Sequence, residues 1–125
     1  TKIQCTVKIC NDNPMFINVT TPYAELFGYK ELQLISRSYE NLVHPDDYYK
    51  LDIDPKDLPD GYNKLGIWKM IKLDKTPVYI NATGNVITCD NTRFLTINVE
   101  LSNQKEYQKQ ELKNLTGLQN PELKE

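Results

Sequence analysis

The residues that could carry out catalysis or hold a metal ion are few, and they are spread along the chain. The sequence has a single histidine, His44, and three cysteines, Cys5, Cys10 and Cys89. Structural zinc sites take four Cys or His ligands at short, paired spacings, and this sequence has no CxxC pair. It also has no glycine-rich phosphate loop and no Ser/His/Asp or Cys/His set. The sequence therefore predicts no metal site.

Two adjacent carboxylates, Asp46 and Asp47, are the remaining candidates for acid–base chemistry. They follow Pro45, where a short helix is expected to begin. Carboxylates at a helix start interact favourably with the free amides and the helix dipole, which is how we interpret this pair. Catalysis would need a second polar group, and the sequence places none beside them. We predict no catalytic residues and no enzymatic activity.

Composition narrows the class of protein further. The 125 residues suit one domain, and the net charge of −2 comes from both signs mixed along the chain, which argues against direct binding of nucleic acid. No apolar run approaches the roughly 18 residues that span a membrane. An odd number of cysteines indicates reduced thiols, as in a cytoplasmic or nuclear protein. The chain begins at Thr1 without a signal-like segment, and we expect it to be part of a longer protein.

The first half of the chain predicts a hairpin followed by short helices. Residues 3–9 alternate apolar and polar side chains as a half-buried strand does, and residues 15–19 form a second strand. Thr21 is expected to cap a helix whose first residue is Pro22. Gly28 ends that helix, since glycine adopts the left-handed conformation of a helix end at no steric cost. A helical turn follows over residues 30–35.

The second half predicts a sheet and a polar tail. Strands are expected at residues 65–73, 78–89 and 94–101. The second of these has a bulge predicted at Gly84. In the last strand the inward positions are Leu95, Ile97, Val99 and Leu101. Strands segregated from helices in this order indicate an α+β domain with an antiparallel sheet over residues 1–103, followed by a helical tail or linker over residues 104–125.

Three segments together resemble the signature of PAS domains. YAELFGY at residues 23–29 is similar to the a-x-x-e-L-x-G-Y pattern of the family, HPDD at residues 44–47 matches most specifically, and ELS at residues 100–102 resembles the Asp-Ile-Thr that often ends the last strand. The order and spacing of these three segments match the family pattern, and the resemblance covers residues 6–102. The motif positions are Gly28, Tyr29, His44, Pro45, Asp46 and Asp47.

Departures from the family pattern indicate a divergent member. Thr20 stands where an asparagine commonly closes the second strand, and Ser36 replaces a glycine. Family members that bind haem use a histidine on the helix after the HPDD-like motif, and the expected helix here has none; the reactive-cysteine motif of flavin-binding members is also missing. The resemblance therefore predicts neither haem nor flavin and leaves an unidentified small ligand open. We interpret His44 as a residue that caps and orients a helix.

The resemblance implies a five-stranded antiparallel sheet with short helices on one face, and a pocket between the two. Residues that could line this pocket, or simply fill the core, are Phe27, Ile35, Leu42, Trp68, Met70, Ile71 and Ile97. A second possibility is a partner surface on the outer face of the sheet and on the tail. Its candidates are Trp68, Phe94, Tyr107, Leu112 and Leu115.

PAS domains are sensory and docking modules of kinases and transcription regulators. The resemblance thus predicts a regulatory module that senses a small ligand or docks a protein partner or a second copy of itself. It would pass the change to an effector domain of the same chain. The alternatives are a dedicated small-molecule or cofactor-binding domain, and the sensor domain of a histidine kinase.

Overall fold

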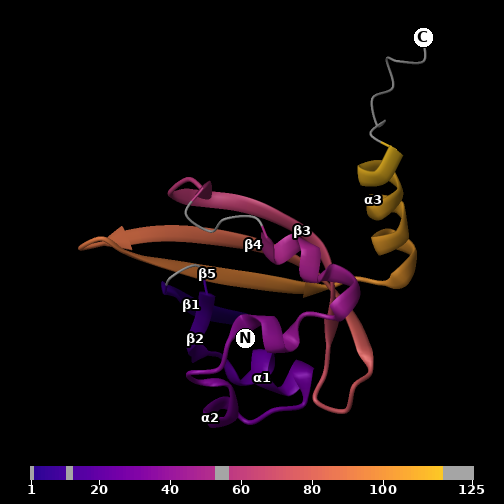
Figure 1. Cartoon of the computed structure of the whole chain (residues 1–125). Coiled ribbons are helices and arrows are strands. Elements are labelled where there is room, and N and C mark those ends of the chain that lie inside the picture. Colours follow the sequence, from indigo (N-terminus) through magenta and orange to yellow (C-terminus); the bar gives the residue numbers. More distant parts are fainter. Residues whose placement is uncertain (1, 11–12, 53–56, 117–125) are drawn as a thin grey trace.

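The computed structural model describes residues 2–10, 13–52 and 57–116. They form a five-stranded antiparallel sheet in the order β2-β1-β5-β4-β3, with short helices against one face (Figure 1). The strands are β1 (Gln4–Cys10), β2 (Asn13–Val19), β3 (Gly61–Ile71), β4 (Pro77–Cys89) and β5 (Thr92–Leu101). The helices are α1 (Thr21–Phe27), α2 (Glu31–Leu34), the 3-10 helices η1 (Tyr39–Leu42) and η2 (Pro45–Asp52), and α3 (Gln104–Thr116). The predicted α+β class is confirmed.

Helix α1 begins one residue away from the predicted cap. Thr20, not Thr21, is the N-cap, and its Oγ1 accepts a hydrogen bond of 3.3 Å from the Tyr23 amide. The Thr20 hydroxyl also donates to the Lys2 carbonyl at 2.7 Å, so the segment before β1 helps to hold the cap in place. Gly28 ends the helix with φ of 85°, in the left-handed region, as predicted.

Strand β5 lies in the middle of the sheet between β1 and β4, and its side chains alternate between the two faces. Leu95, Ile97 and Val99 are buried, which confirms the predicted inward face. Leu101 was predicted to point inward as well, but its side chain is 62% exposed. It stands at the end of β5, opposite Ile80 of β4 and beyond Asn98, where the pairing of β5 with β1 ends. Leu101 therefore has a neighbouring strand on one side only.

Strand β3 begins at Gly61, four residues earlier than predicted, and forms an edge of the sheet. The bulge predicted at Gly84 of β4 is found in β3 instead. The pairing of β4 with both neighbours runs without a break at Gly84, and the register shift lies in β3, between Lys64 and Gly66. This places Gly66, with φ of 81°, at the irregularity.

The core fills the space between the inner face of the sheet and the short helices. Aromatic rings form its centre, with Tyr23 between Phe16 at 5.9 Å and Phe27 at 5.0 Å, and Tyr39 at 5.5 Å from Phe16. All four side chains are buried. Such edge-on and tilted ring pairs add to the energy of apolar burial, so this cluster fixes α1 against β2.

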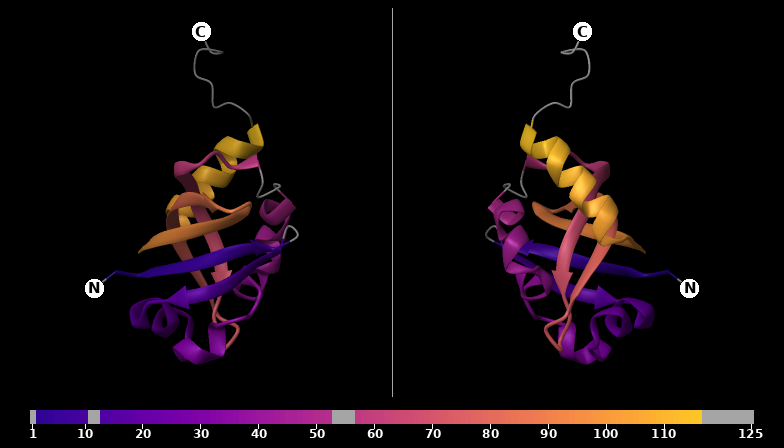
Figure 2. Two further views of the ribbon diagram at one scale, coloured as in Figure 1. Left: turned by 90° about the vertical axis from the view of Figure 1, so that its left-hand side faces the viewer. Right: turned by 90° about the vertical axis from the view of Figure 1, so that its right-hand side faces the viewer.

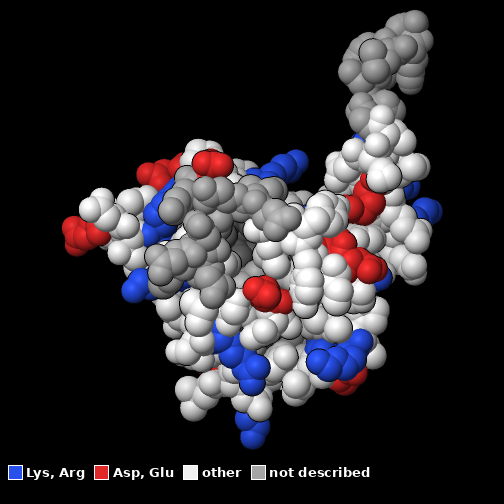
Figure 3. Space-filling model, viewed as in Figure 1, with Lys and Arg blue, Asp and Glu red and all other residues white. Residues whose placement is uncertain are grey.

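Helix α3 follows β5 directly and projects away from the body of the domain beside β3 (Figures 1 and 2). It covers most of the predicted helical tail, and residues 117–125 lie outside the described part of the chain. Acidic and basic side chains are interspersed on the face of the molecule seen in Figure 3, in keeping with the mixed charge of the sequence. None of the described helices has the length and apolar character needed to cross a bilayer.

Candidate functional site

The outer edge of β3 is covered by side chains from η2 and α3 and by the backbone of His44, just before η2. The backbone amide of Lys69 donates to Asp47 Oδ2 at 2.8 Å, and the Lys69 carbonyl accepts from the His44 amide at 3.0 Å. Two residues earlier in β3, the Gln110 side chain accepts a hydrogen bond from the Ile67 amide and donates one to the Ile67 carbonyl, both at 2.8 Å. Gln110 thus bonds to the strand edge as a peptide group would.

Asp47 is fully buried and lies at the centre of these contacts. Besides the Lys69 amide, it accepts hydrogen bonds from the Tyr107 hydroxyl at 2.6 Å and from Lys50 Nζ at 3.0 Å. Asp47 lies in the first turn of η2, as interpreted from the sequence, but its oxygens face β3 and α3, and these contacts were not predicted. Asp46 points elsewhere, to the Lys69 ammonium at 2.8 Å, and this contact lowers the pKa of Asp46 and raises that of Lys69.

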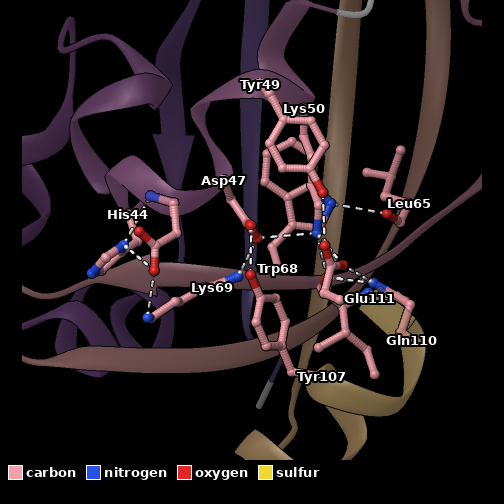
Figure 4. Close-up of polar contacts among 12 residues, drawn as sticks. His44, Asp47, Tyr49, Lys50, Leu65, Trp68, Lys69, Tyr107, Gln110 and Glu111 are labelled. Carbon is pink, nitrogen blue, oxygen red and sulfur yellow. Dashed lines mark hydrogen bonds and ion pairs between the residues drawn. The ribbon is translucent and has the colours of Figure 1, made fainter. Parts of the chain in front are cut away.

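The Lys50 ammonium lies between η2, β3 and α3. It donates to Asp47 Oδ2 at 3.0 Å, to Glu111 Oε2 at 2.9 Å and to the Ile67 carbonyl at 3.1 Å (Figure 4). Its side chain is only 11% exposed. Three ring centroids lie around it, those of Tyr107 at 5.2 Å, Trp68 at 5.5 Å and Tyr49 at 5.9 Å. We refer to Asp47, Tyr49, Lys50, Trp68, Tyr107 and Glu111 as the Lys50 cluster.

Helix α3 is attached to the domain mainly by polar groups. Its partly buried positions are Tyr107, Gln110 and Glu111, spaced to lie on one face of the helix. Tyr107 also packs against the Tyr79 ring at 5.0 Å. The two leucines that were predicted as partner-surface residues point away from the domain, with Leu112 64% and Leu115 75% exposed. This segment therefore docks on the domain mainly through hydrogen bonds and ion pairs.

Gly66 makes this docking sterically feasible. A Cβ at this position would lie 2.9 Å from Gln110 Oε1, too close for an ordinary contact. The positive φ of Gly66 is also strained for a residue with a side chain. The bulge in β3 and the approach of α3 therefore depend on the same glycine.

Charge and burial in the Lys50 cluster shift three pKa values. Burial, and then donation to Asp47, raise the pKa of Tyr107 well above its ordinary range. The hydrogen bond from Tyr49 to Glu111, at 2.7 Å, is the main cause that raises the pKa of Tyr49 to about 12. For Glu111, burial acts to raise the pKa, but the hydrogen bonds from Tyr49, Lys50 and Gln110 outweigh it, and the net pKa is lowered. The cluster thus favours an ionised Glu111 and protonated tyrosines.

The lowered pKa of Glu111 predicts that acid weakens the docking of α3. The pKa of Glu111 in the docked state lies below its ordinary value of 4.5, so docking makes protonation of this carboxylate harder. Its contribution is therefore fully present above pH 4.5 and is lost as the pH falls through the lowered value. We expect the fluorescence of Trp68, the only tryptophan, to change over this range. The Glu111→Gln variant should lack this part of the change, and identical acid titrations of the two proteins would contradict the assignment.

Five of the seven predicted pocket residues lie in the core or pack against it, namely Phe27, Leu42, Met70, Ile97 and Trp68. Phe27, Leu42 and Met70 are fully buried, and Ile97 is 2% exposed. The other three, Ile35, Trp68 and Ile71, are partly exposed. Ligand binding by these residues stays a prediction.

The predicted partner-surface residues separate into three places. Trp68 lies in the Lys50 cluster, where its indole Nε1 donates to the Leu65 carbonyl at 2.9 Å, so it is not on the outer face of the sheet. Phe94 is partly exposed and pairs in register with Lys8 and Ile87. Tyr107, Leu112 and Leu115 lie on α3, the first turned inward and the two leucines outward.

The motif residues have structural partners in the described chain. His44 Nδ1 accepts from the Asp46 amide at 3.0 Å, and Pro45 is the first residue of η2, an arrangement that fits the predicted capping. Tyr29 lies under the Arg37 guanidinium, whose Cζ is 5.8 Å from the ring centroid. The motif thus positions η2 so that Asp47 and Lys50 reach the edge of β3.

Four residues of the site were not identified from the sequence: Tyr49, Lys50, Gln110 and Glu111. Lys50 stands three residues after Asp47, a spacing that allows an ion pair on one face of a helix. On α3, Gln110 and Glu111 follow Tyr107 at the spacing of one helix face. Polar residues at this spacing could have indicated the docked face, just as apolar residues do. A search for apolar packing alone passes over such residues.

Comparisons with known proteins identify the fold. No protein-family model and no curated protein sequence matches the chain. Among solved structures, a light-oxygen-voltage domain studied with a flavin analogue aligns with a TM-score of 0.71 and 13% identity, over 94% of this chain and 88% of that one. The PAS domain of an HTR-like protein from Haloarcula marismortui aligns with a TM-score of 0.64 and 11% identity, over 79% and 81%.

A third match is a PAS-B domain of Drosophila melanogaster Cycle with bound glycerol, with a TM-score of 0.64 and 9% identity, over 78% of this chain and 99% of that one. These identities are too low to carry over a ligand or partner, and they show the fold alone. The five-stranded antiparallel sheet and the short helices on its inner face agree with them. This chain has the PAS fold.

Proposed function

We propose that this domain is a regulatory module of a larger signalling or transcription-regulating protein, in which α3 passes a change at the sheet to a neighbouring effector domain. The observation that carries the proposal is the attachment of α3 by the Lys50 cluster and Gln110. A helix of 13 residues is marginally stable by itself in water, so its order depends on these contacts. Because the attachment consists mainly of hydrogen bonds and ion pairs, an input that competes for one of these partners would shift the balance between the docked and released states.

A protein partner or a second copy of the chain is the input that the geometry favours. The predicted pocket residues Phe27, Leu42 and Met70 are packed without exposure. Exposed apolar groups are available outside, at Leu112 and Leu115 on α3 and at Ile87 on the sheet. A PAS domain of a two-component sensor histidine kinase is among the similar structures, which supports a place in a signalling chain. We expect a cytoplasmic or nuclear protein without enzymatic activity, haem or flavin.

A small-molecule-binding domain is the second candidate, and one buried group favours it. The Tyr23 hydroxyl is fully buried and makes no hydrogen bond of good geometry within the described part of the chain, although the Cys5 thiol and the Tyr39 hydroxyl lie close enough to affect its pKa. Its neighbours are the Cys5 thiol and the Tyr39 hydroxyl, and burial raises the pKa of all three groups. A small polar ligand beside Tyr23 would supply the missing partner. Native mass spectrometry of the purified chain would reveal such a ligand as added mass.

The Tyr107→Phe variant tests the role of α3. It removes only the hydroxyl that donates to Asp47. A hydrogen bond to a charged group contributes about 1.5–3 kcal/mol, so amide-exchange protection in α3 should fall roughly 10- to 160-fold while β5 keeps its protection. In the parent protein the same substitution should shift effector output towards one state.

Tyr62→Phe is the matched control, because Tyr62 is 69% exposed on β3. It should leave both the protection of α3 and the output unchanged. Unchanged protection of α3 in Tyr107→Phe would show that the hydroxyl does not hold the helix. Release of α3 without any change in output would remove the regulatory role.

A further inference from the structure

The surroundings of the Lys50 ammonium have the composition of a binding site for an organic cation. Two carboxylates, Asp47 and Glu111, supply the negative charge at 3.0 and 2.9 Å. The Ile67 carbonyl adds a third acceptor at 3.1 Å. The three donors of a primary ammonium thus each have an acceptor, and the side chain that carries them is nearly buried, with 11% exposed.

Aromatic rings complete the enclosure. The Lys50 nitrogen is 5.2 Å from the ring centroid of Tyr107, 5.5 Å from that of Trp68 and 5.9 Å from that of Tyr49. Cations within about 6 Å of an aromatic face are attracted by the ring quadrupole, and the attraction grows when water is excluded. A compact ammonium with three N–H groups fits these acceptors and rings, whereas a quaternary ammonium has no N–H and would leave the acceptors unpaired.

The site is assembled from three elements, as Figure 4 shows. Asp47 and Tyr49 come from η2, Trp68 and the Ile67 carbonyl from β3, and Tyr107 and Glu111 from α3. We infer that the Lys50 cluster is a binding site for a primary ammonium group, which the chain fills with its own Lys50, and that α3 closes over the occupied site. The inference rests on the docking of α3 used in the proposed function and adds the ligand chemistry that controls it.

The decisive experiment empties the site and refills it from solution. Lys50→Ala removes three methylenes and the ammonium, which are the atoms of n-propylammonium. We expect amide-exchange protection of α3 to fall at least about tenfold, which corresponds to 1.4 kcal/mol, and the emission of Trp68 to shift. Added n-propylammonium should restore both in a saturable manner, whereas 1-propanol and tetramethylammonium should not. Should the variant unfold, recovery of the folded state by n-propylammonium becomes the readout.

Lys69→Ala is the matched control, because the Lys69 ammonium binds the exposed carboxylate of Asp46 outside the cluster. n-Propylammonium should have no effect on it. Lys50→Met keeps the stem without the charge, and it should lower amide-exchange protection more in α3 than in the sheet. Failure of n-propylammonium to restore Lys50→Ala, equal restoration by 1-propanol, or a fully docked α3 in Lys50→Met would each overturn the inference. The Tyr107→Phe measurements judge the proposed function independently of these outcomes.

Discussion

Replacing Asp47 by alanine is expected to lower the free energy of unfolding by about 3–5 kcal/mol, the range found when one partner of a buried ion pair is removed. The carboxylate is 0% exposed, and it accepts from the Lys69 amide, the Lys50 ammonium and the Tyr107 hydroxyl. Without it these donors lose their acceptor in a place that water reaches poorly. Urea denaturation followed by far-UV circular dichroism measures the change.

Asp46→Ala is the control for that experiment, since the neighbouring carboxylate is 60% exposed and binds only at the surface. An exposed ion pair contributes about 0–1 kcal/mol, so the control should unfold close to the wild-type midpoint. If the two alanine variants are equally stable, Asp47 does not hold the edge of the sheet and the site has been assigned wrongly. Asp47→Ala should also release α3, which amide exchange in that helix detects separately from global unfolding.

Ile97→Ala is expected to destabilise the domain by about 2–5 kcal/mol, as truncation of a large aliphatic side chain in a close-packed core does. Ile97 is 2% exposed and belongs to the central strand, with β1 on one side and β4 on the other. Its side chain therefore packs between the sheet and the helices, where the surrounding structure relaxes poorly around a cavity. Thermal or urea unfolding gives the value.

The same substitution on the outer face provides the comparison. Ile87 lies on β4 and is 51% exposed, so Ile87→Ala should change stability by no more than about 0.5 kcal/mol. If Ile87→Ala lowers the free energy of unfolding strongly and Ile97→Ala does so only slightly, the inner and outer faces of the sheet have been exchanged in our assignment.

Local patterns in the sequence determined much of the fold. The alternation of Leu95, Ile97 and Val99 predicted the buried face of β5, because side chains on a strand point to opposite faces in turn. Gly28 marked the end of α1, since glycine adopts the left-handed conformation found there without the steric strain that a side chain would add. The same logic failed at Leu101, where the alternation continues beyond the part of β5 that pairs with β1. Periodicity specifies which face a side chain is on and leaves open whether that face is covered.

The candidate site depended on tertiary structure. The sequence indicated that Asp47 lies at a helix start. Its donor, the Lys69 amide, is 22 residues later in the chain and reaches Asp47 only because β3 folds beside η2. Lys50 and Glu111 are 61 residues apart, and neither lies in a segment whose pattern requires the other. Apolar burial is periodic and can be read from a single segment. A polar network forms between distant segments that each look ordinary, because a hydrogen bond needs two partners brought within about 3 Å by the rest of the fold.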